Sequence, residues 1–324
     1  MYGKFLNIAI LATIFALPVT TNAQGGFLLG TETIADSDFP VAYYMVETVD
    51  GLYVPVGLRK PSGSGPFPIV VFASGNGGGG LGWGKNSSHN RGWTLDRFLG
   101  AGYAVVWMRY RAEVELGFNK NEQLIKGGRQ GMQMFNRGPL EIDDEISIIE
   151  FLKTLPFVNP NQVVHVGMSH GGEMAMKITS QYHGLAAAVA NEPASHEFLG
   201  LTPDETAFIT EDTGMWNIEE MQMRDAEATR NRINLDLALE RVSTITTPIL
   251  VHGRHDDHLQ GIFRLTYEVL AEAGKETAWK SYDHDAHGFI YVSRSEDGQY
   301  HPDPIQVEVV EDTIAWLDNQ LKTK

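Results

Sequence analysis

Residues 163–172 read Val-Val-His-Val-Gly-Met-Ser-His-Gly-Gly, an apolar run followed at once by a G-x-S-x-G pattern. The apolar run is typical of a strand buried on both faces of a parallel sheet, and a helical pattern begins near Ser169. A serine on so tight a strand-to-helix turn is held in a strained backbone, with its hydroxyl projecting from the sheet edge. Gly167 and Gly171 flank it because a Cβ at either position would collide in this turn. We therefore predict that Ser169 is a nucleophile, with the backbone N–H of His170 facing the oxyanion formed when it attacks.

The segments on either side alternate between apolar runs and helical patterns. The runs expected to be buried strands are Ile69 to Ala73, Tyr103 to Met108, Leu185 to Ala190 and Ile249 to His252. One helical pattern covers about Leu140 to Leu155, and others begin near Leu259 and Pro304. Ahead of them, Val41 to Leu58 is predicted to be a two-stranded hairpin around Asp50-Gly51. Strands alternating with helices indicate an α/β fold with a doubly wound, mostly parallel sheet.

One long segment, Pro193 to Val242, interrupts this alternation. It is polar and rich in acidic residues. The residues that recur in it with helical periodicity are Met215, Ile218, Met221 and Ile233. About 50 residues between two sheet strands is too long for a simple loop. We expect a small helical cap, inserted at about residues 193–242 and folded over the C-terminal edge of the sheet, whose methionines suit an acyl or aryl group beneath it.

Carboxylates and histidines follow two later strands, where they would meet the serine at the same sheet edge. Asp256 and Asp257 lie just past the strand predicted at residues 249–252 and are candidate acids. The candidate bases, His284 and His287, lie in a later loop. The chain order serine, carboxylate, histidine is the order that α/β-hydrolases use. Glu192, at the end of an earlier strand, is an alternative acid, because triad geometry is not tied to sequence position.

These motifs resemble the catalytic domain of the prolyl oligopeptidase and dienelactone hydrolase branch of the α/β-hydrolase superfamily. The family's nucleophile motif matches Gly167 to Gly172. Its acid motif, H-G-x-x-D, matches His252 to Asp256, and its base motif, H-G-F, matches His287 to Phe289. The resemblance covers nearly the whole chain after residue 23 and is clearest from about Ile69 onward. It implies an α/β-hydrolase fold with a serine nucleophile.

The same resemblance implies a catalytic triad of Ser169, His287 and Asp256. By their places in the family's motifs, Asp256 is favoured over its neighbour Asp257, and His287 over His284. In this triad His287 is the general base and Asp256 holds the imidazole.

A glycine-rich loop, Ser74 to Gly80, follows the first buried strand, where the family usually has His-Gly. Such a loop suits backbone N–H donors near the serine, and we expect the second oxyanion donor at Asn76 or Gly77. The overlapping stretch Gly79 to Lys85 nearly spells the phosphate-binding pattern G-x-x-x-x-G-K. Asn86 stands where that pattern needs Ser or Thr for magnesium, so we do not expect a nucleotide site.

Composition argues against several other classes of function. The chain has 324 residues, a formal net charge of −16 and a pI near 5.1, so it repels nucleic acid and anionic membranes. It has no cysteine, which excludes a thiolate nucleophile and disulfides. His252, His255 and His258 lack the spacing of a helical zinc site, and we interpret them as a polar rim of the active site. We expect no metal, no cofactor and no nucleic-acid partner.

The N-terminal segment is typical of a secretory signal peptide. Met1 to Lys4 is a short charged region, Phe5 to Val19 is apolar but short for a membrane span, and Thr21 to Ala23 offers a cleavage site. We expect residues 1–23 to be removed, leaving a hydrolase domain at 24–324. We therefore expect the protein to be secreted or periplasmic and to have no membrane association after cleavage.

Together these features predict a serine hydrolase that works through an acyl-enzyme. A small carboxylic ester is the expected substrate, because amide hydrolysis demands more help in protonating the leaving group. The alternative is a serine peptidase of the prolyl oligopeptidase type, acting on short peptides whose N-terminal amine is bound by acidic residues of the cap. Specificity is expected to lie in the cap and in the loops around Trp83 and Trp107, because loop chemistry does not follow from fold.

Overall fold

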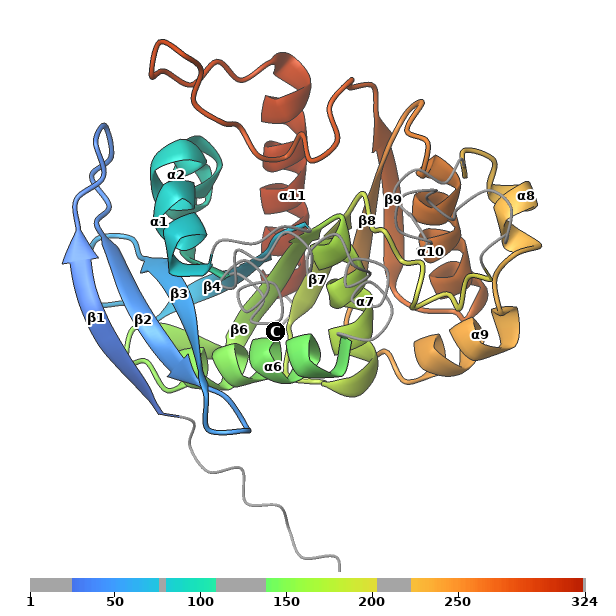
Figure 1. Cartoon of the computed structure of the whole chain (residues 1–324), viewed down its shortest axis with the longest axis horizontal. Helices are drawn as coiled ribbons and strands as arrows, with labels where there is room; N and C mark the ends of the chain where they lie inside the picture. The colour runs from blue at the N-terminus through green and yellow to red at the C-terminus, as the bar shows by residue number, and fades with distance from the viewer. Residues whose placement is uncertain (1–24, 76–79, 109–137, 203–222, 323–324) are drawn as a thin grey trace, which may run out of the picture.

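The computed structural model describes residues 25–75, 80–108, 138–202 and 223–322. Its centre is a nine-stranded sheet of order β1-β2-β3-β5-β4-β6-β7-β8-β9, which runs from β1 at the left of Figure 1 to β9 at the right. The strands are β1 Gly26–Glu32, β2 Val41–Glu47, β3 Tyr53–Arg59, β4 Phe67–Ala73, β5 Ala104–Met108, β6 Val158–Met168, β7 Ala187–Asn191, β8 Ile249–Arg254 and β9 Thr277–Tyr282. The strands from β5 to β9 in this order pair in parallel. The predicted α/β fold with a mostly parallel sheet is confirmed.

The three N-terminal strands form an antiparallel extension of this sheet. The predicted hairpin is confirmed as β2 and β3, and Gly51 at its turn has φ +78°, a conformation that glycine adopts without strain. β1 pairs with β2 at the sheet edge and was not predicted. Its side chains are largely exposed, so residues 26–32 lack the apolar alternation that marks a half-buried strand.

Helices cover both faces of the sheet, as a doubly wound fold requires. They are α1 Gly80–Asn90, α2 Gly92–Gly100, α6 Gly138–Lys153, α7 His170–Gln181, α8 Ala226–Arg230, α9 Leu235–Ser243, α10 Gln260–Glu272 and α11 Pro304–Lys322. Val70 and Phe72 of β4 belong to a core cluster shared with α2 and α11. Ile69 and Val71 of the same strand belong to a cluster shared with α6 and α7. This alternation along one strand places the two layers of helices on opposite faces.

Part of the predicted glycine-rich loop is helical, which corrects its expected extent. Residues 80–90 form α1, although glycine is a poor helix former. Leu81 and Trp83 pack against the core cluster of α2 and α11, and this packing outweighs the low helix propensity. Trp107 is buried and donates its indole N–H to the carbonyl of Gly84 at 2.9 Å. Trp107 therefore anchors α1 to β5, whereas the loop expected to contribute to specificity begins at residue 109, outside the described residues.

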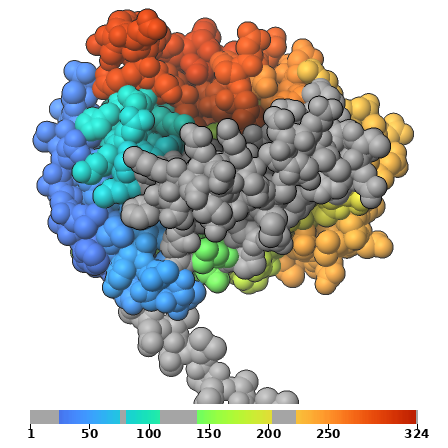
Figure 2. All heavy atoms as spheres, in the orientation of Figure 1, coloured from blue at the N-terminus to red at the C-terminus, as the bar shows by residue number. Residues whose placement is uncertain are grey.

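The described part of the predicted cap belongs to the main core. Phe198, Met223 and Val242 are buried with residues of β7, β8 and α10, and α9 is the helix that precedes β8. On the face shown in Figure 2, the N-terminal strands lie at one side of the molecule and α8 and α9 at the other. Residues 203–222, on which a cap over the sheet edge depends, lie outside the described residues, as do residues 1–23 of the predicted signal peptide. Among the helices of the described ranges, none is long and apolar enough to cross a membrane.

Candidate active site

Ser169 stands between the last residue of β6 and the first residue of α7. Its backbone has φ +57° and ψ −115°, a region that costs a non-glycine residue about 1–3 kcal/mol. Hydrogen bonds hold it there: its N–H donates to the carbonyl of Asn191 at 2.9 Å, and its carbonyl accepts from Glu173 and Ala194 at 3.1 Å each. The predicted strained turn at the end of a parallel strand is therefore present at Ser169.

The two glycines of the motif are required by backbone contacts. A Cβ on Gly167 would lie 1.9 Å from the carbonyl oxygen of Gly171, and a Cβ on Gly171 would lie 2.1 Å from that of Ala73. No side-chain movement relieves either clash, because both obstacles are main chain. The glycines thus allow α7 to start directly against β4 and β6.

His170, the expected oxyanion donor, begins α7, so its N–H is among the first helical N–H groups that have no partner within the helix. Its side chain is buried, and Nε2 lies 2.7 Å from Oε2 of the buried Glu141 on α6. This buried pair ties the residue after the nucleophile to the neighbouring helix.

The end of β4 lies beside the nucleophile. A Cβ on Gly75 would lie 3.3 Å from the Cβ of Ser169, so the loop that leaves β4 starts next to the serine. The other expected oxyanion donors, Asn76 and Gly77, lie outside the described residues. Their role stays a prediction.

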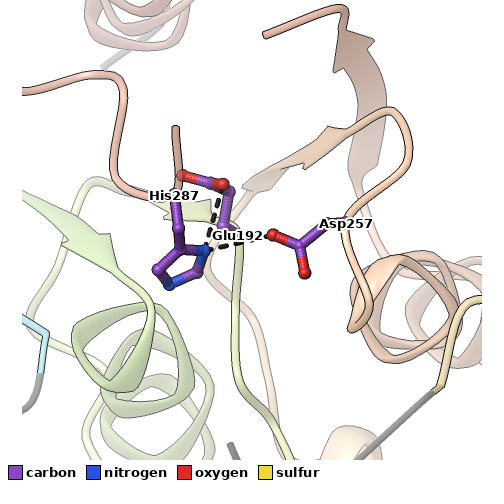
Figure 3. A group of neighbouring side chains, drawn as sticks. All are labelled: Glu192, Asp257 and His287. Carbon is purple, nitrogen blue, oxygen red and sulfur yellow. Dashed lines mark hydrogen bonds and ion pairs between the residues drawn. The ribbon is translucent and has the colours of Figure 1, made fainter. Parts of the chain in front are cut away.

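His287 lies in the loop after β9 and faces two carboxylates. Its Nδ1 lies 3.3 Å from Oδ2 of Asp257 and 3.2 Å from Oε1 of Glu192, as Figure 3 shows. The next residue, Gly288, donates its N–H to Oε2 of Glu192 at 2.6 Å. A Cβ on Gly288 would lie 3.1 Å from the Cε of Met168, so this loop packs against the residue that precedes the nucleophile.

The carboxylate that pairs with His287 differs from the expected Asp256. Asp256 is exposed, has φ +57°, and its carbonyl accepts a hydrogen bond from Arg224 at 2.5 Å. Asp257 is buried, and its Oδ1 accepts from the N–H of Leu259 at 2.7 Å. The left-handed backbone at Asp256 directs that side chain to solvent and the following one toward the imidazole. The predicted pairing of Asp256 with His287 is thus corrected to Asp257, with Glu192, the alternative acid, as a second partner.

The charges around His287 favour its protonated form. Burial alone would lower the pKa of His287, but its contacts with Asp257 and Glu192 raise it to about 10. Burial would raise the pKa of Asp257, yet contacts with His287, the Leu259 N–H and Arg254 hold it well below its usual range. Asp257 is therefore ionised, and the imidazolium that forms during proton transfer is strongly stabilised.

Three side chains of this site could in principle act as metal ligands. Among the residues that the structure describes, Glu192, Asp257 and His287 offer atoms that all lie within 4.8 Å of one another. The oxygens Glu192 Oε1 and Asp257 Oδ2 both accept hydrogen bonds from Nε of Arg254, at 3.1 and 3.0 Å. A cation at this point would have to displace the guanidinium.

The three histidines near the end of β8 are not gathered into one cluster. His252 is buried with its Nδ1 2.7 Å from Oδ1 of Asn191, and burial lowers its pKa to about 3. His255 is exposed, whereas His258 places Nδ1 3.2 Å from Oδ1 of Asp257. His258 therefore belongs to the rim of the site, while His252 supports the strand β7 from which Glu192 follows.

Sequence reasoning missed Arg254 and Asn191. Arg254 contacts both carboxylates, and Asn191 accepts from the N–H of Ser169 while its side-chain amide donates to the carbonyl of Gly167 at 3.1 Å. Two features of the sequence could have indicated these residues. Arg254 is a charged residue inside the acid motif, and Asn191 with Glu192 forms a polar pair at the end of an apolar strand.

The sheet order and the strained strand-to-helix turn at Ser169 are those of the α/β-hydrolase class. Within that class, the chain belongs to the prolyl oligopeptidase family, whose model matches residues 87–324. A curated relative, the uncharacterized peptidase YuxL of Bacillus subtilis (strain 168), is 26% identical over 249 residues, which are 74% of this chain and 34% of that protein. The chain thus spans about a third of the length of this relative.

Solved structures of both peptidases and esterases share the fold. The acylaminoacyl peptidase of Pyrococcus horikoshii superposes with a TM-score of 0.57 at 19% identity, over 88% of this chain and 42% of that one. A putative dienelactone hydrolase from Klebsiella pneumoniae subsp. pneumoniae MGH 78578 gives 0.54 at 12% identity, over 87% and 99%. An esterase from Rhizomucor miehei gives 0.57 at 16% identity, over 89% and 84%. At these identities the likeness concerns the fold alone.

Proposed function

We propose that this protein hydrolyses small carboxylic esters through an acyl-enzyme on Ser169. The observation that carries the proposal is the imidazole of His287, held between two buried carboxylates on a loop that packs against Met168, the residue before the strained serine. A serine on such a turn, a histidine with an oriented ring and a helix N-terminus beside them are the parts that acyl transfer needs.

The proton and the acyl group follow a defined path in this mechanism. Because Nδ1 of His287 faces Asp257 and Glu192, its Nε2 is the ring nitrogen that accepts the proton from the Ser169 hydroxyl as the oxygen attacks the carbonyl carbon. The backbone N–H of His170 stabilises the oxyanion. His287 returns the proton to the leaving group as its bond to the acyl carbon breaks. Water then attacks the acyl-enzyme by the same route, releasing the acid and restoring the serine.

The electrostatics of His287 favour an ester over an amide. Two carboxylates make the imidazolium a weak acid, with a pKa near 10. An amide needs a proton on its nitrogen as the C–N bond breaks, and a weak acid supplies it slowly. An ester releases a better leaving group and depends less on this step.

A serine peptidase acting on short peptides is the second candidate. It is favoured by membership of the prolyl oligopeptidase family and by the peptidase among the curated relatives. The acids of the segment 203–222, among them Glu219 and Glu220, would then bind the N-terminal amine of the substrate. We further propose that either enzyme acts outside the cytoplasm after loss of residues 1–23, which mass spectrometry of the exported chain tests by its N-terminal residue.

The first experiment asks whether Ser169 is the nucleophile. A fluorophosphonate probe should label the purified protein and its Ser243→Ala variant, which loses an exposed serine on α9. Ser169→Ala should abolish labelling and turnover while the circular dichroism spectrum stays unchanged. Labelling that persists in Ser169→Ala would disprove the proposed nucleophile.

The second experiment separates the two substrates. The rate constant kcat/KM is compared between short acyl esters and dipeptidyl amides that differ only in the bond cleaved. If the proposal is correct, kcat/KM is higher for the acyl esters than for the dipeptidyl amides, and Glu219→Gln or Glu220→Gln leaves the value for the esters unchanged. A gain of about tenfold or more from a free N-terminal amine, removed by either variant, would instead establish the peptidase.

A further inference from the structure

Arg254, the last residue of β8, joins three parts of the active site. Its Nε donates to Glu192 at 3.1 Å and to Asp257 at 3.0 Å, and its Nη2 donates to Asp257 at 2.5 Å. Its Nη1 donates to the carbonyls of His284 and Asp285 at 3.0 and 2.9 Å. One guanidinium thus connects the end of β7, the turn after β8 and the loop that carries His287.

The position of Arg254 balances the charge of the cluster. The side chains of Glu192 and Asp257 are fully buried, and that of Arg254 is 11% exposed. Two buried carboxylates and one guanidinium leave a charge of −1 facing His287, which the imidazolium neutralises. The other groups near this cluster are the His258 ring beside Asp257, the N–H groups of Leu259 and Gly288, and the Phe263 ring stacked on the imidazole.

We propose that Arg254 is a positioning residue for His287, setting both the place of the imidazole and the pH at which it accepts a proton. This inference rests on the proposed function, in which His287 is the general base. The planar guanidinium of Arg254 suits this positioning role, because its N–H groups point in several directions and donate to two carboxylates and two carbonyls at once. A lysine at this position supplies the charge but not that geometry.

Charge and geometry predict different effects for different variants. Arg254→Met removes the positive charge, so His287 faces a more negative cluster and its pKa rises further. The acid limb of kcat/KM should then move up by about one pH unit or more, lowering kcat/KM by about tenfold at a fixed pH below the midpoint. Arg254→Lys should keep the midpoint near that of the wild type yet lower kcat about tenfold, because the loop carbonyls of His284 and Asp285 lose their donors.

A matched control separates these effects from the loss of any surface arginine. Arg264 lies on α10 with its side chain 40% exposed and pairs with Glu268. Arg264→Met removes the same charge away from the cluster and should leave kcat/KM and its pH profile unchanged.

The test measures kcat and KM for an acyl ester across about pH 6 to pH 10.5, for the wild type and the three arginine variants. Because the midpoint expected for Arg254→Met lies above this range, its shift is determined from the ratio of kcat/KM between variant and wild type at fixed pH on the acid limb. Support requires a raised midpoint in Arg254→Met and a lowered kcat in Arg254→Lys, with KM changed less than twofold in the lysine variant. If Arg254→Met does not fold, the kcat of Arg254→Lys decides. A folded Arg254→Met with the wild-type midpoint, or Arg254→Lys with the wild-type kcat, would overturn the inference. Failure of the proposed function is distinct, because the wild type would then either lack fluorophosphonate labelling at Ser169 or be labelled there without hydrolysing acyl esters.

Discussion

Replacing the two adjacent aspartates one at a time tests the geometry around His287 most directly. Asp257→Asn removes a carboxylate 3.3 Å from Nδ1 and substitutes an amide of nearly the same shape. Asp256→Asn makes the same chemical change at the exposed neighbour, and Glu192→Gln makes it at the second partner. The three variants differ only in where one negative charge is lost.

The expected magnitude follows from the pKa of His287. It lies near 10, compared with the usual 6.5, a difference worth on the order of 5 kcal/mol. Because the side chain is 35% exposed, solvent screening reduces this to about 2–3 kcal/mol. Two carboxylates at nearly equal distance share this stabilisation of the imidazolium, so loss of the Asp257 charge alone should lower kcat/KM by about tenfold. Loss of the orienting contact adds to this, up to the roughly ten-thousandfold loss found where a triad has a single acid.

We therefore expect Asp257→Asn to lower kcat/KM by about a hundredfold, since Glu192 still holds the ring. Glu192→Gln should have a similar effect, and the double variant should approach ten-thousandfold. Asp256→Asn should stay within about threefold of the wild type. The assay is ester hydrolysis across pH, in which both damaging variants should also move the acid limb to lower pH, because each lowers the pKa of His287. A larger loss from Asp256→Asn than from Asp257→Asn would refute this assignment of the acid.

Two further predictions concern stability. Gly171→Ala forces a Cβ to within 2.1 Å of the carbonyl oxygen of Ala73, so it should lower the free energy of unfolding by more than about 3 kcal/mol and abolish activity. The control Gly82→Ala lies in open space on α1 and should be neutral or stabilising by about 0.5–1 kcal/mol. Equal thermal unfolding temperatures for the two variants would contradict the predicted clash. The raised pKa of His287 contributes stability that is complete below about pH 6.5 and is lost as pH rises to about 10, while activity rises over the same range because the base must be neutral. The difference in unfolding free energy between the wild type and His287→Asn should shrink across this interval, and a constant difference would contradict the assigned pKa.

Local rules account for the features that were predicted correctly. The strand β6, the turn at Ser169 and the start of α7 follow from an apolar run and two glycines whose Cβ atoms would meet main-chain oxygens. The hairpin of β2 and β3 follows from Asp50-Gly51 in the same way. Each of these depends on residues close together in the chain, so the pattern of residue types is sufficient.

Long-range packing accounts for the features that were missed. The predicted glycine-rich loop extends to Gly80 and its overlapping motif to Lys85, yet a helix begins at Gly80 because Leu81 and Trp83 pack against the core. The edge strand β1 exists because β2 offers it a free row of hydrogen-bonding groups.

The amino-acid sequence alone was enough to predict the fold class, the strained turn at Ser169 and the loop that carries His287, since strand periodicity, glycine sterics and motif order are local properties. The carboxylates that hold His287 were decided by the tertiary structure. Asp256 and Asp257 are chemically identical neighbours, and the left-handed backbone at Asp256 turns one outward and the other inward. Glu192 and Arg254 reach the imidazole because β7 and β8 are adjacent strands that end at the same edge. That adjacency arises from the packing of the whole sheet, which no local pattern encodes.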